Sequence, residues 1–213
     1  MKAGFTLIEL LVVLAIFTVI MSVALFDQAG LNSNILITNL AYETALAVRE
    51  AQTYGIGVRA TGGTSSFDKG YGAYFDTDNI NQVVVFGDTD GNNFYTTGST
   101  ELQSLYEIKN QRGNKITSIC VGASPCTSAN TGATFLTPGS HNKLSIMFKR
   151  PNPEATFHVF DQSGTEISTP VGPAVIDVNN AAGTNCRAIV VETTGQIRVE
   201  NSTGGNCTNT PTP

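Results

Sequence analysis

The chain has 213 residues, of which 14% are charged, and its formal net charge is −5. This length suits one domain of moderate size with an appendage. The acidic balance gives no general excess of cations of the kind that nucleic-acid-binding proteins carry. Frequent glycine, with asparagine and threonine recurring through the second half, favours a loop-rich β domain outside the cytoplasm.

Residues 5–26 form an apolar run, and the four residues before it carry a single positive charge at Lys2. Of these 22 residues 18 are apolar, and a helix of that length is about 33 Å long, enough to cross a bilayer core. The positive-inside tendency keeps Lys2 in the cytoplasm and places the rest outside. The run therefore predicts a single transmembrane helix. A secretory signal cut near Ala24 or Ala29 is the alternative.

Glu9 is the one charged residue inside this run. A carboxylate there costs about 2.5–3.5 kcal/mol on membrane-insertion scales. The cost makes sense if Glu9 meets a cation in an assembled state, and the free α-amino group of a neighbouring copy would serve. Cleavage between Gly4 and Phe5 would create that amino group. The alternative is a carboxylate near the membrane interface that snorkels or is protonated, and both interpretations stay open.

Residues 4–16, GFTLIELLVVLAI, resemble the class III signal of type IV pilins and type II secretion pseudopilins nearly residue for residue. The resemblance implies that a prepilin peptidase cuts after Gly4 and that the new N-terminal Phe5 is methylated. It also implies that Glu9 pairs with the N-terminal amine of an adjacent subunit. The proline that many relatives carry around residues 22–27 is absent here.

The rest of the chain predicts an amphipathic helix followed by short strands. Apolar residues at spacings of three and four predict a helix over 27–54, with Gly55 as its C-terminal cap. A β-rich domain follows over 55–205, and residues 206–213 form a loose tail. Alternating segments predict strands near 56–60, 71–76, 82–87, 103–109, 115–121, 143–149, 156–161, 174–178, 186–192 and 195–200. Thr193-Thr194-Gly195 predicts a hairpin turn between the last two.

Three stretches, residues 39–51, 144–148 and 187–199, resemble the helix, mid-domain strand and closing hairpin of GspH-like pseudopilins and FimT-type minor pilins. The resemblance implies an α+β pilin fold, in which a long N-terminal helix packs on an antiparallel β-sheet domain. It also implies a structural subunit that enters the bacterial inner membrane as a precursor and then joins other subunits in a pilus or pseudopilus. The alternative is a tip or minor pilin that binds DNA or an exported substrate.

Four cysteines, all after residue 119, predict two disulfides in an exported chain: Cys120, Cys126, Cys186 and Cys207. Three pairings are possible. Cys120–Cys126 and Cys186–Cys207 are favoured because each pair is local, and the loop-entropy model gives these rings about 2.4 and 3.4 kcal/mol. Reduced, buried cysteines are the alternative.

Asp88, Asp90 and Asn92 place oxygen ligands at alternate positions, as calcium-binding loops do. Glu101 lies close to the spacing of the glutamate that closes such a loop, but the flanking segments are predicted strands rather than helices. The alternative is a polar turn. No other cofactor is predicted, and no enzyme is, because neither His141 nor His158 has a nucleophile motif beside it.

Arg187 and Arg198 both fall on the predicted closing hairpin. FimT-like pilins of DNA-uptake systems carry a Gly-Arg-x-Arg signature there, whereas this chain has Gly195-Gln196-Ile197-Arg198 and lacks one arginine. Phosphate binding needs several cations on one face. These arginines are therefore nucleic-acid candidates, with solvated strand charges as the alternative.

Overall fold

The structure is a computed structural model that describes residues 6–26, 28–57, 69–80, 82–107, 113–122, 134–136, 142–180, 183 and 185–202. The side chains of residues 24–33 and 135 are not described. The chain divides into two compact units, Met1–Ile35 and Leu36–Pro213. Each unit is described by itself below.

The first unit holds α1 (Leu7–Phe26) and the start of α2 (Gln28–Ile56). These helices correspond to the segments predicted over 5–26 and 27–54, and Asp27 between them lies outside the described residues. In the described part of the chain, no helix combines the length and the apolar character needed to cross a membrane. The transmembrane helix predicted over 5–26 is not confirmed.

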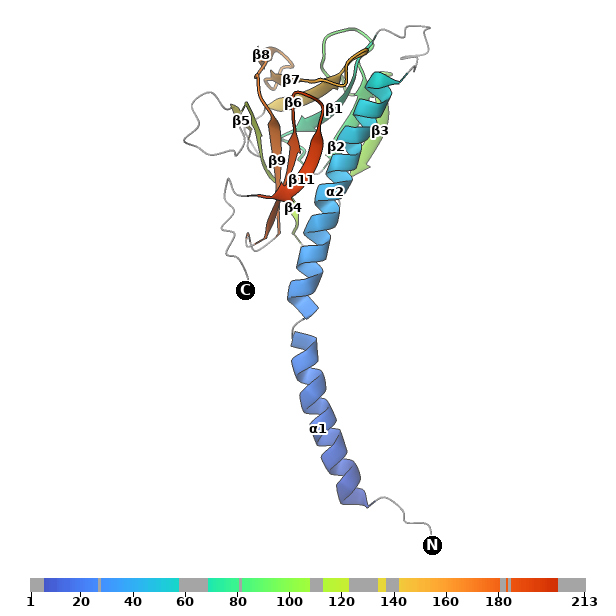
Figure 1. Cartoon of the computed structure of the whole chain (residues 1–213), viewed down its shortest axis with the longest axis vertical. Coiled ribbons are helices and arrows are strands. Elements are labelled where there is room, and N and C mark those ends of the chain that lie inside the picture. Colours follow the sequence, from blue (N-terminus) through green and yellow to red (C-terminus); the bar gives the residue numbers. More distant parts are fainter. Residues whose placement is uncertain are drawn as a thin grey trace. The chain divides into compact units, whose positions relative to one another are not determined.

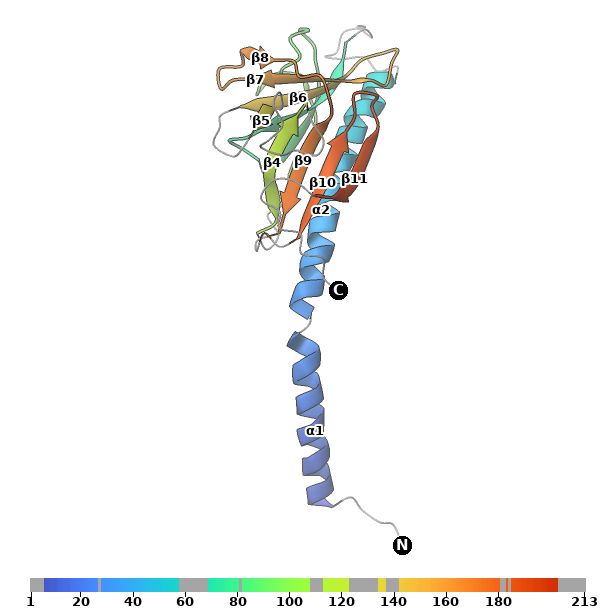
Figure 2. The same cartoon turned by 60° about the vertical axis from the view of Figure 1, so that its left-hand side comes forward.

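The second unit contains two sheets beside the second half of α2 (Figures 1 and 2). All strand pairs are antiparallel. The six-stranded sheet has the order β3 (Leu102–Glu107), β2 (Gln82–Gly87), β1 (Tyr71–Asp76), β6 (Lys143–Phe148), β7 (Ala155–Phe160) and β8 (Glu166–Ser168). The five-stranded sheet has the order β11 (Ile197–Asn201), β10 (Cys186–Val191), β9 (Ala174–Asn179), β4 (Lys115–Val121) and β5 (Thr134–Leu136). Helix and antiparallel sheets together confirm the predicted α+β class.

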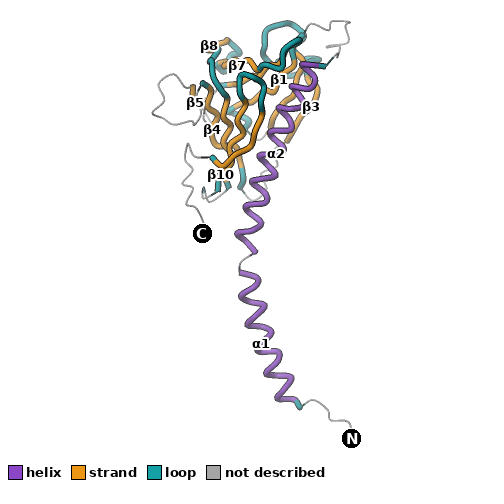
Figure 3. Tube along the Cα trace, viewed as in Figure 1, coloured by secondary structure: helices purple, strands orange, loops and turns teal. Residues whose placement is uncertain are grey.

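Most strand predictions agree with the described strands (Figure 3). The sequence analysis does not predict β5 and β8. β8 has three residues, too few to show an alternation, and the residues on both sides of β5 lie outside the described ranges. The strand predicted near 56–60 is wrong at its start, since Ile56 is the last residue of α2, and residues 58–60 lie outside the described ranges.

One core joins the buried stripe of α2 to the inward side chains of both sheets. The helix contributes residues at the predicted spacings of three and four, so its apolar stripe faces the sheets. Burial of this stripe, more than intrinsic propensity, stabilises a helix of this kind. The helix residues in the core are Ile37, Leu40, Ala41, Ala45, Ala47, Val48 and Ala51.

Gly55 lies inside α2 and not after it, so the predicted C-terminal cap is wrong. The reason for glycine here is close packing against β6. A Cβ atom at Gly55 would lie 2.6 Å from the backbone oxygen of Phe148. A contact with another element, which the sequence does not display, therefore determines this glycine.

The hairpin turn at Thr193-Thr194-Gly195 is confirmed. β10 and β11 pair on either side of it, and Gly195 has φ +84°, a conformation that favours glycine. The amide of Gly195 donates to the carbonyl of Glu192 at 2.8 Å. This turn brings the start of β11 close to α2.

Candidate functional site

Thr6 and Glu9 form a reciprocal cap at the start of α1. The backbone N–H and the hydroxyl of Thr6 donate to Glu9 Oε2 at 2.9 and 2.8 Å, and the N–H of Glu9 donates to Thr6 Oγ1 at 3.4 Å. This is a capping box, in which residues three apart satisfy each other's unpaired backbone amides. Its Thr-x-x-Glu spacing is readable in the sequence, although the sequence analysis does not use it.

Glu9 therefore has a local role within one chain in addition to the predicted role between chains. Its charge also lies where the helix macrodipole favours an anion. Gly4 and Phe5, the predicted cleavage and methylation sites, lie outside the described residues. The large apolar side chains of α1 between Leu10 and Val23 are exposed, Met21 by 46%. A row of exposed apolar side chains along a helix marks a site of membrane or protein contact.

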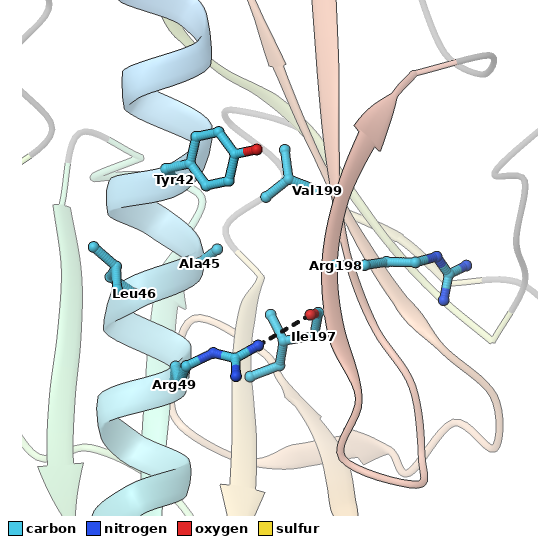
Figure 4. Close-up of a pocket in the computed structure, with 7 residues that line it drawn as sticks. All are labelled: Tyr42, Ala45, Leu46, Arg49, Ile197, Arg198 and Val199. Carbon is cyan, nitrogen blue, oxygen red and sulfur yellow. Dashed lines mark hydrogen bonds between the residues drawn. The ribbon is translucent and has the colours of Figure 1, made fainter.

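A pocket of about 220 Å³ lies between α2 and β11 (Figure 4). Arg49 reaches across it and donates to the carbonyl of Ile197 at 3.1 Å. Tyr42 and Leu46 line the pocket and are still 56% and 58% exposed. The sequence predicts the helix that forms one wall, but not the pocket, because the hairpin on the other side lies some 150 residues away. The lining residues are Tyr42, Ala45, Leu46, Arg49, Ile197, Arg198 and Val199.

Arg198 points away from this pocket (Figure 4). Its guanidinium pairs with Glu192 at 2.5 Å and with Glu200 at 3.1 Å. These two hydrogen-bonded carboxylates raise the pKa of Arg198 above its ordinary value. The cation is thus already matched by two anions of the same hairpin.

Arg187 does not share a face with Arg198. Arg198 lies opposite Val190 in the β10–β11 ladder, whereas Arg187 lies opposite Asn201 and donates to its side-chain oxygen. Cross-strand partners share a face and faces alternate along a strand, so an odd separation of three residues places the two arginines on opposite faces. The structure does not join these two nucleic-acid candidates in one cationic surface.

The calcium candidates Asp88 and Asp90 lie together with Glu101, and their carboxylate oxygens are within 4.8 Å of one another. Asn92, the third candidate, donates its side-chain amide to Asp90 at 2.7 Å. Asp88 accepts the backbone N–H of Gly91 at 2.8 Å and that of Asn92 at 3.1 Å. Burial raises the pKa of Asp88. This arrangement closes a polar turn with its own amides, and calcium binding stays a prediction.

Glu101 belongs to the same turn and is almost fully buried. It accepts hydrogen bonds from the amide and hydroxyl of Thr89 at 3.2 and 3.0 Å and from the amide of Thr96 at 3.1 Å. These contacts account for the burial of the carboxylate, because a buried charge needs several donors.

Cys120 and Cys186 are both disulfide-bonded, and Cys126 and Cys207 lie outside the described residues. Cys120 lies opposite Val175 on β9 and Cys186 lies opposite Asn179. Four residues of strand separate these positions by about 13 Å. Since bridged Cα atoms lie within about 7 Å, Cys120 is not bonded to Cys186. Two of the three pairings remain, and the local pairing is one of them.

His158, on β7, lies between Glu166 and Thr156. Its Nδ1 is 2.5 Å from Glu166 Oε1 and its Nε2 is 3.2 Å from Thr156 Oγ1. Both ring nitrogens are thus engaged at the β7–β8 edge of the six-stranded sheet, and the pair holds the short strand β8 in place. His141 lies outside the described residues.

Polar side chains of α2 bind both sheets, and the sequence analysis does not predict these contacts. Ser104 on β3 donates to Glu50 at 2.7 Å, and the hydroxyl of Tyr106 donates to the same carboxylate. On the other flank Gln52 donates to the carbonyl of Gly195 at 2.6 Å. Only an assembled fold reveals such contacts between distant segments.

Comparison with family models matches residues 1–25 to the prokaryotic N-terminal methylation motif. No curated protein and no solved structure matches the chain. The match covers the predicted leader and the helix that follows and leaves out the β domain, so the finer resemblance to GspH-like and FimT-type proteins is not confirmed. Proteins with this motif are structural rather than enzymatic. Residues 1–25 carry the signature that type IV pilins and pseudopilins share and that directs processing by prepilin peptidase.

Proposed function

We propose that this chain is a structural subunit, of the minor class, in a type IV pilus or a type II secretion pseudopilus. The observation that carries the proposal is the methylation motif at residues 1–25, which includes most of an apolar helix with exposed side chains, in a chain that also has a separate β-sheet unit. A protein built in this way has one part suited to an apolar environment and one part suited to water.

The precursor would enter the bacterial inner membrane through its apolar N-terminal run, with the β domain outside. Prepilin peptidase would then remove residues 1–4 and leave a methylated Phe5. The exposed apolar side chains of α1 favour transfer from lipid to contact with other subunits, because both environments exclude water. Glu9 would pair with the new N-terminal amine of an adjacent subunit, which offsets the cost of a carboxylate in an apolar surrounding.

Mass analysis of the N-terminus of membrane-extracted protein tests the proposal. A mature terminus at methylated Phe5 is expected. In Gly4→Ala processing should change, and a bulky residue such as Leu at position 4 should block it while the precursor stays in the membrane. A mature terminus near Ala24 or Ala29 would mean that the N-terminal run is a secretory signal, and the proposal would be wrong.

A further inference from the structure

Glu43 and Arg49 are exposed on α2, and neither forms an ion pair within the described part of the chain. They cannot pair with each other. Side chains on a helix meet at separations of three or four residues, whereas six residues rotate by 600°, which leaves the two on different flanks. Each flank of the helix therefore carries one charge that no ion pair among the described residues neutralises.

The Arg49 flank borders the pocket beside β11 (Figure 4). The Glu43 flank is the one that faces β3, because Glu50, seven residues further on and on the same side of the helix, binds Ser104 and Tyr106. The exposed side chains of Tyr42 and Leu46 lie on the ridge between the two flanks. The Glu43 flank is thus acidic. The Arg49 flank is basic and contains the pocket beside β11, which is called the recess below.

We infer that the Glu43 flank of one copy docks into the recess of a second copy, where Glu43 pairs with Arg49. This inference rests on the proposed function and names the surface through which the folded units make contact. With the two α2 helices parallel, a shift of six residues, about 9 Å, brings Glu43 level with Arg49. The same shift brings Leu36 of the first copy level with Tyr42 of the second. The ion pair and the apolar contact therefore require the same shift of one helix along the other.

Two further observations support a second copy of this chain as the partner that fills the recess. The recess, at about 220 Å³, is smaller than the roughly 300–1,000 Å³ of sites that enclose small molecules, and suits side chains of a neighbouring helix. The two flanks of a single copy differ, so the contact is heterologous. Heterologous contacts repeat and produce open helical filaments when the rotation does not close a ring. An antiparallel two-fold contact centred on Leu46 would form the same ion pairs but would stop at a dimer.

Cross-linking of the full-length protein in cells that contain its processing peptidase separates these arrangements. In Arg49→Lys the charge is kept, and a carbodiimide can couple Lys at 49 to Glu43 of a neighbour. The expected result is a ladder of multimers whose cross-linked peptide joins positions 43 and 49. Dimers alone would show the two-fold contact, and cross-links to a different protein would show another partner. Either result would overturn the inference.

Charge reversal provides the second test. Glu43→Arg and Arg49→Glu should each reduce multimers at least about tenfold, because like charges then face each other, and the double variant should restore them to within about twofold. The exposed charges Glu154 and Lys115 offer matched controls, Glu154→Arg and Lys115→Glu, which should assemble normally. Thermal unfolding of each variant checks the fold. If wild-type protein is not processed to a terminus at Phe5, the proposed function fails as well. If it is processed, but multimers of this chain do not form or the single reversals assemble like wild type, only this contact fails.

Discussion

Gln52 on α2 donates its side-chain amide to the backbone carbonyl of Gly195 at 2.6 Å. The same amide reaches the carbonyl of Pro153 at 3.3 Å. Gly195 has φ +84°, and a Cβ atom there would lie 1.9 Å from the Pro153 oxygen. Three segments far apart in the sequence therefore meet at one amide group, which holds the helix against the last hairpin.

Substitutions at this junction should destabilise the fold in a graded way. Gly195→Ala combines an unfavourable φ with a backbone clash and should lower the free energy of unfolding by more than about 2 kcal/mol. Gln52→Ala leaves two carbonyls without this donor and should cost about 1–2 kcal/mol. Urea unfolding of detergent-solubilised protein measures both. Thr194→Ala, at the exposed position of the same turn, should stay within about 0.5 kcal/mol.

Glycines show where sequence analysis succeeds and where it stops. Gly195 follows two threonines between alternating segments, so local turn chemistry is enough to predict its hairpin. Gly55 sits at the end of a helical pattern and suggests a cap, but its actual cause is the backbone oxygen of Phe148, nearly a hundred residues away. Local patterns thus predict elements, while contacts between elements decide what each residue does there.

The candidate sites divide in the same way. The motif around Glu9 is local, so the sequence alone predicts it. The Thr-x-x-Glu spacing of the capping box is equally local, although the sequence analysis does not use it. The faces of Arg187 and Arg198 depend on the register of two strands, and the recess beside Arg49 depends on where a distant hairpin packs. No pattern within one segment contains that information.

Tyr106 should titrate at unusually high pH. The hydrogen bond to Glu50 is the main reason that its pKa rises from 10.0 to about 12, because removal of the phenol proton would leave two anions in contact. In Glu50→Gln the second anion is absent, and the pKa of Tyr106 should fall toward its ordinary value. Phenolate absorbance during alkaline titration, with Tyr106→Phe subtracted to isolate this residue, measures the change. An unchanged titration in Glu50→Gln would contradict the assignment.

Asp177 should make stability depend on pH. It is buried on β9 and accepts hydrogen bonds from Ser118 at 2.9 Å and Ser202 at 2.7 Å, and burial raises the pKa of its carboxyl above 3.8. The folded protein therefore binds this proton more tightly than the unfolded chain does. Its stabilising contribution is present below the unfolded pKa and is lost as the pH rises through the raised folded pKa.

Asp177→Asn should remove this dependence. Near neutral pH the variant should be at least as stable as wild type, and wild type should gain on it as the pH falls toward about 4. Asp161, which is partly exposed, supplies a control of opposite sign, since hydrogen bonds from Ser163 and Thr165 lower the pKa of Asp161. Asp161→Asn should be less stable than wild type near neutral pH, and this difference should close on acidification. Parallel pH trends in the two variants would show that one of the two assignments is wrong.

The disulfide pairing has a direct test. Digestion without reducing agent should release one peptide pair that joins Cys120 to Cys126 and another that joins Cys186 to Cys207. The strand register already excludes Cys120–Cys186, so the competing result is Cys120 with Cys207. Detection of that cross-link would show that the pairing is not local.

The capping box allows the two roles of Glu9 to be separated. Glutamine at the third position of a helix can still close a capping box, but it has no charge to pair with an amine. Glu9→Gln should therefore keep processing and the start of α1, yet impair incorporation into multimers as strongly as Glu9→Val. Thr6→Ala should do the reverse: it removes the hydroxyl partner, costs the helix start about 1 kcal/mol, and leaves the carboxylate free to pair.

Incorporation of each variant, measured by cross-linking in processed membranes, decides between these roles. If Glu9→Gln assembles like wild type while Thr6→Ala does not, the carboxylate serves the helix start and the amine pairing is unnecessary. If Glu9→Gln fails and Thr6→Ala assembles, the charge itself is required between subunits. The distinction matters because one carboxylate oxygen, Glu9 Oε2, accepts both hydrogen bonds from Thr6. The other carboxylate oxygen, Glu9 Oε1, can pair with the N-terminal amine of a neighbouring subunit while the hydrogen bonds of the capping box stay in place.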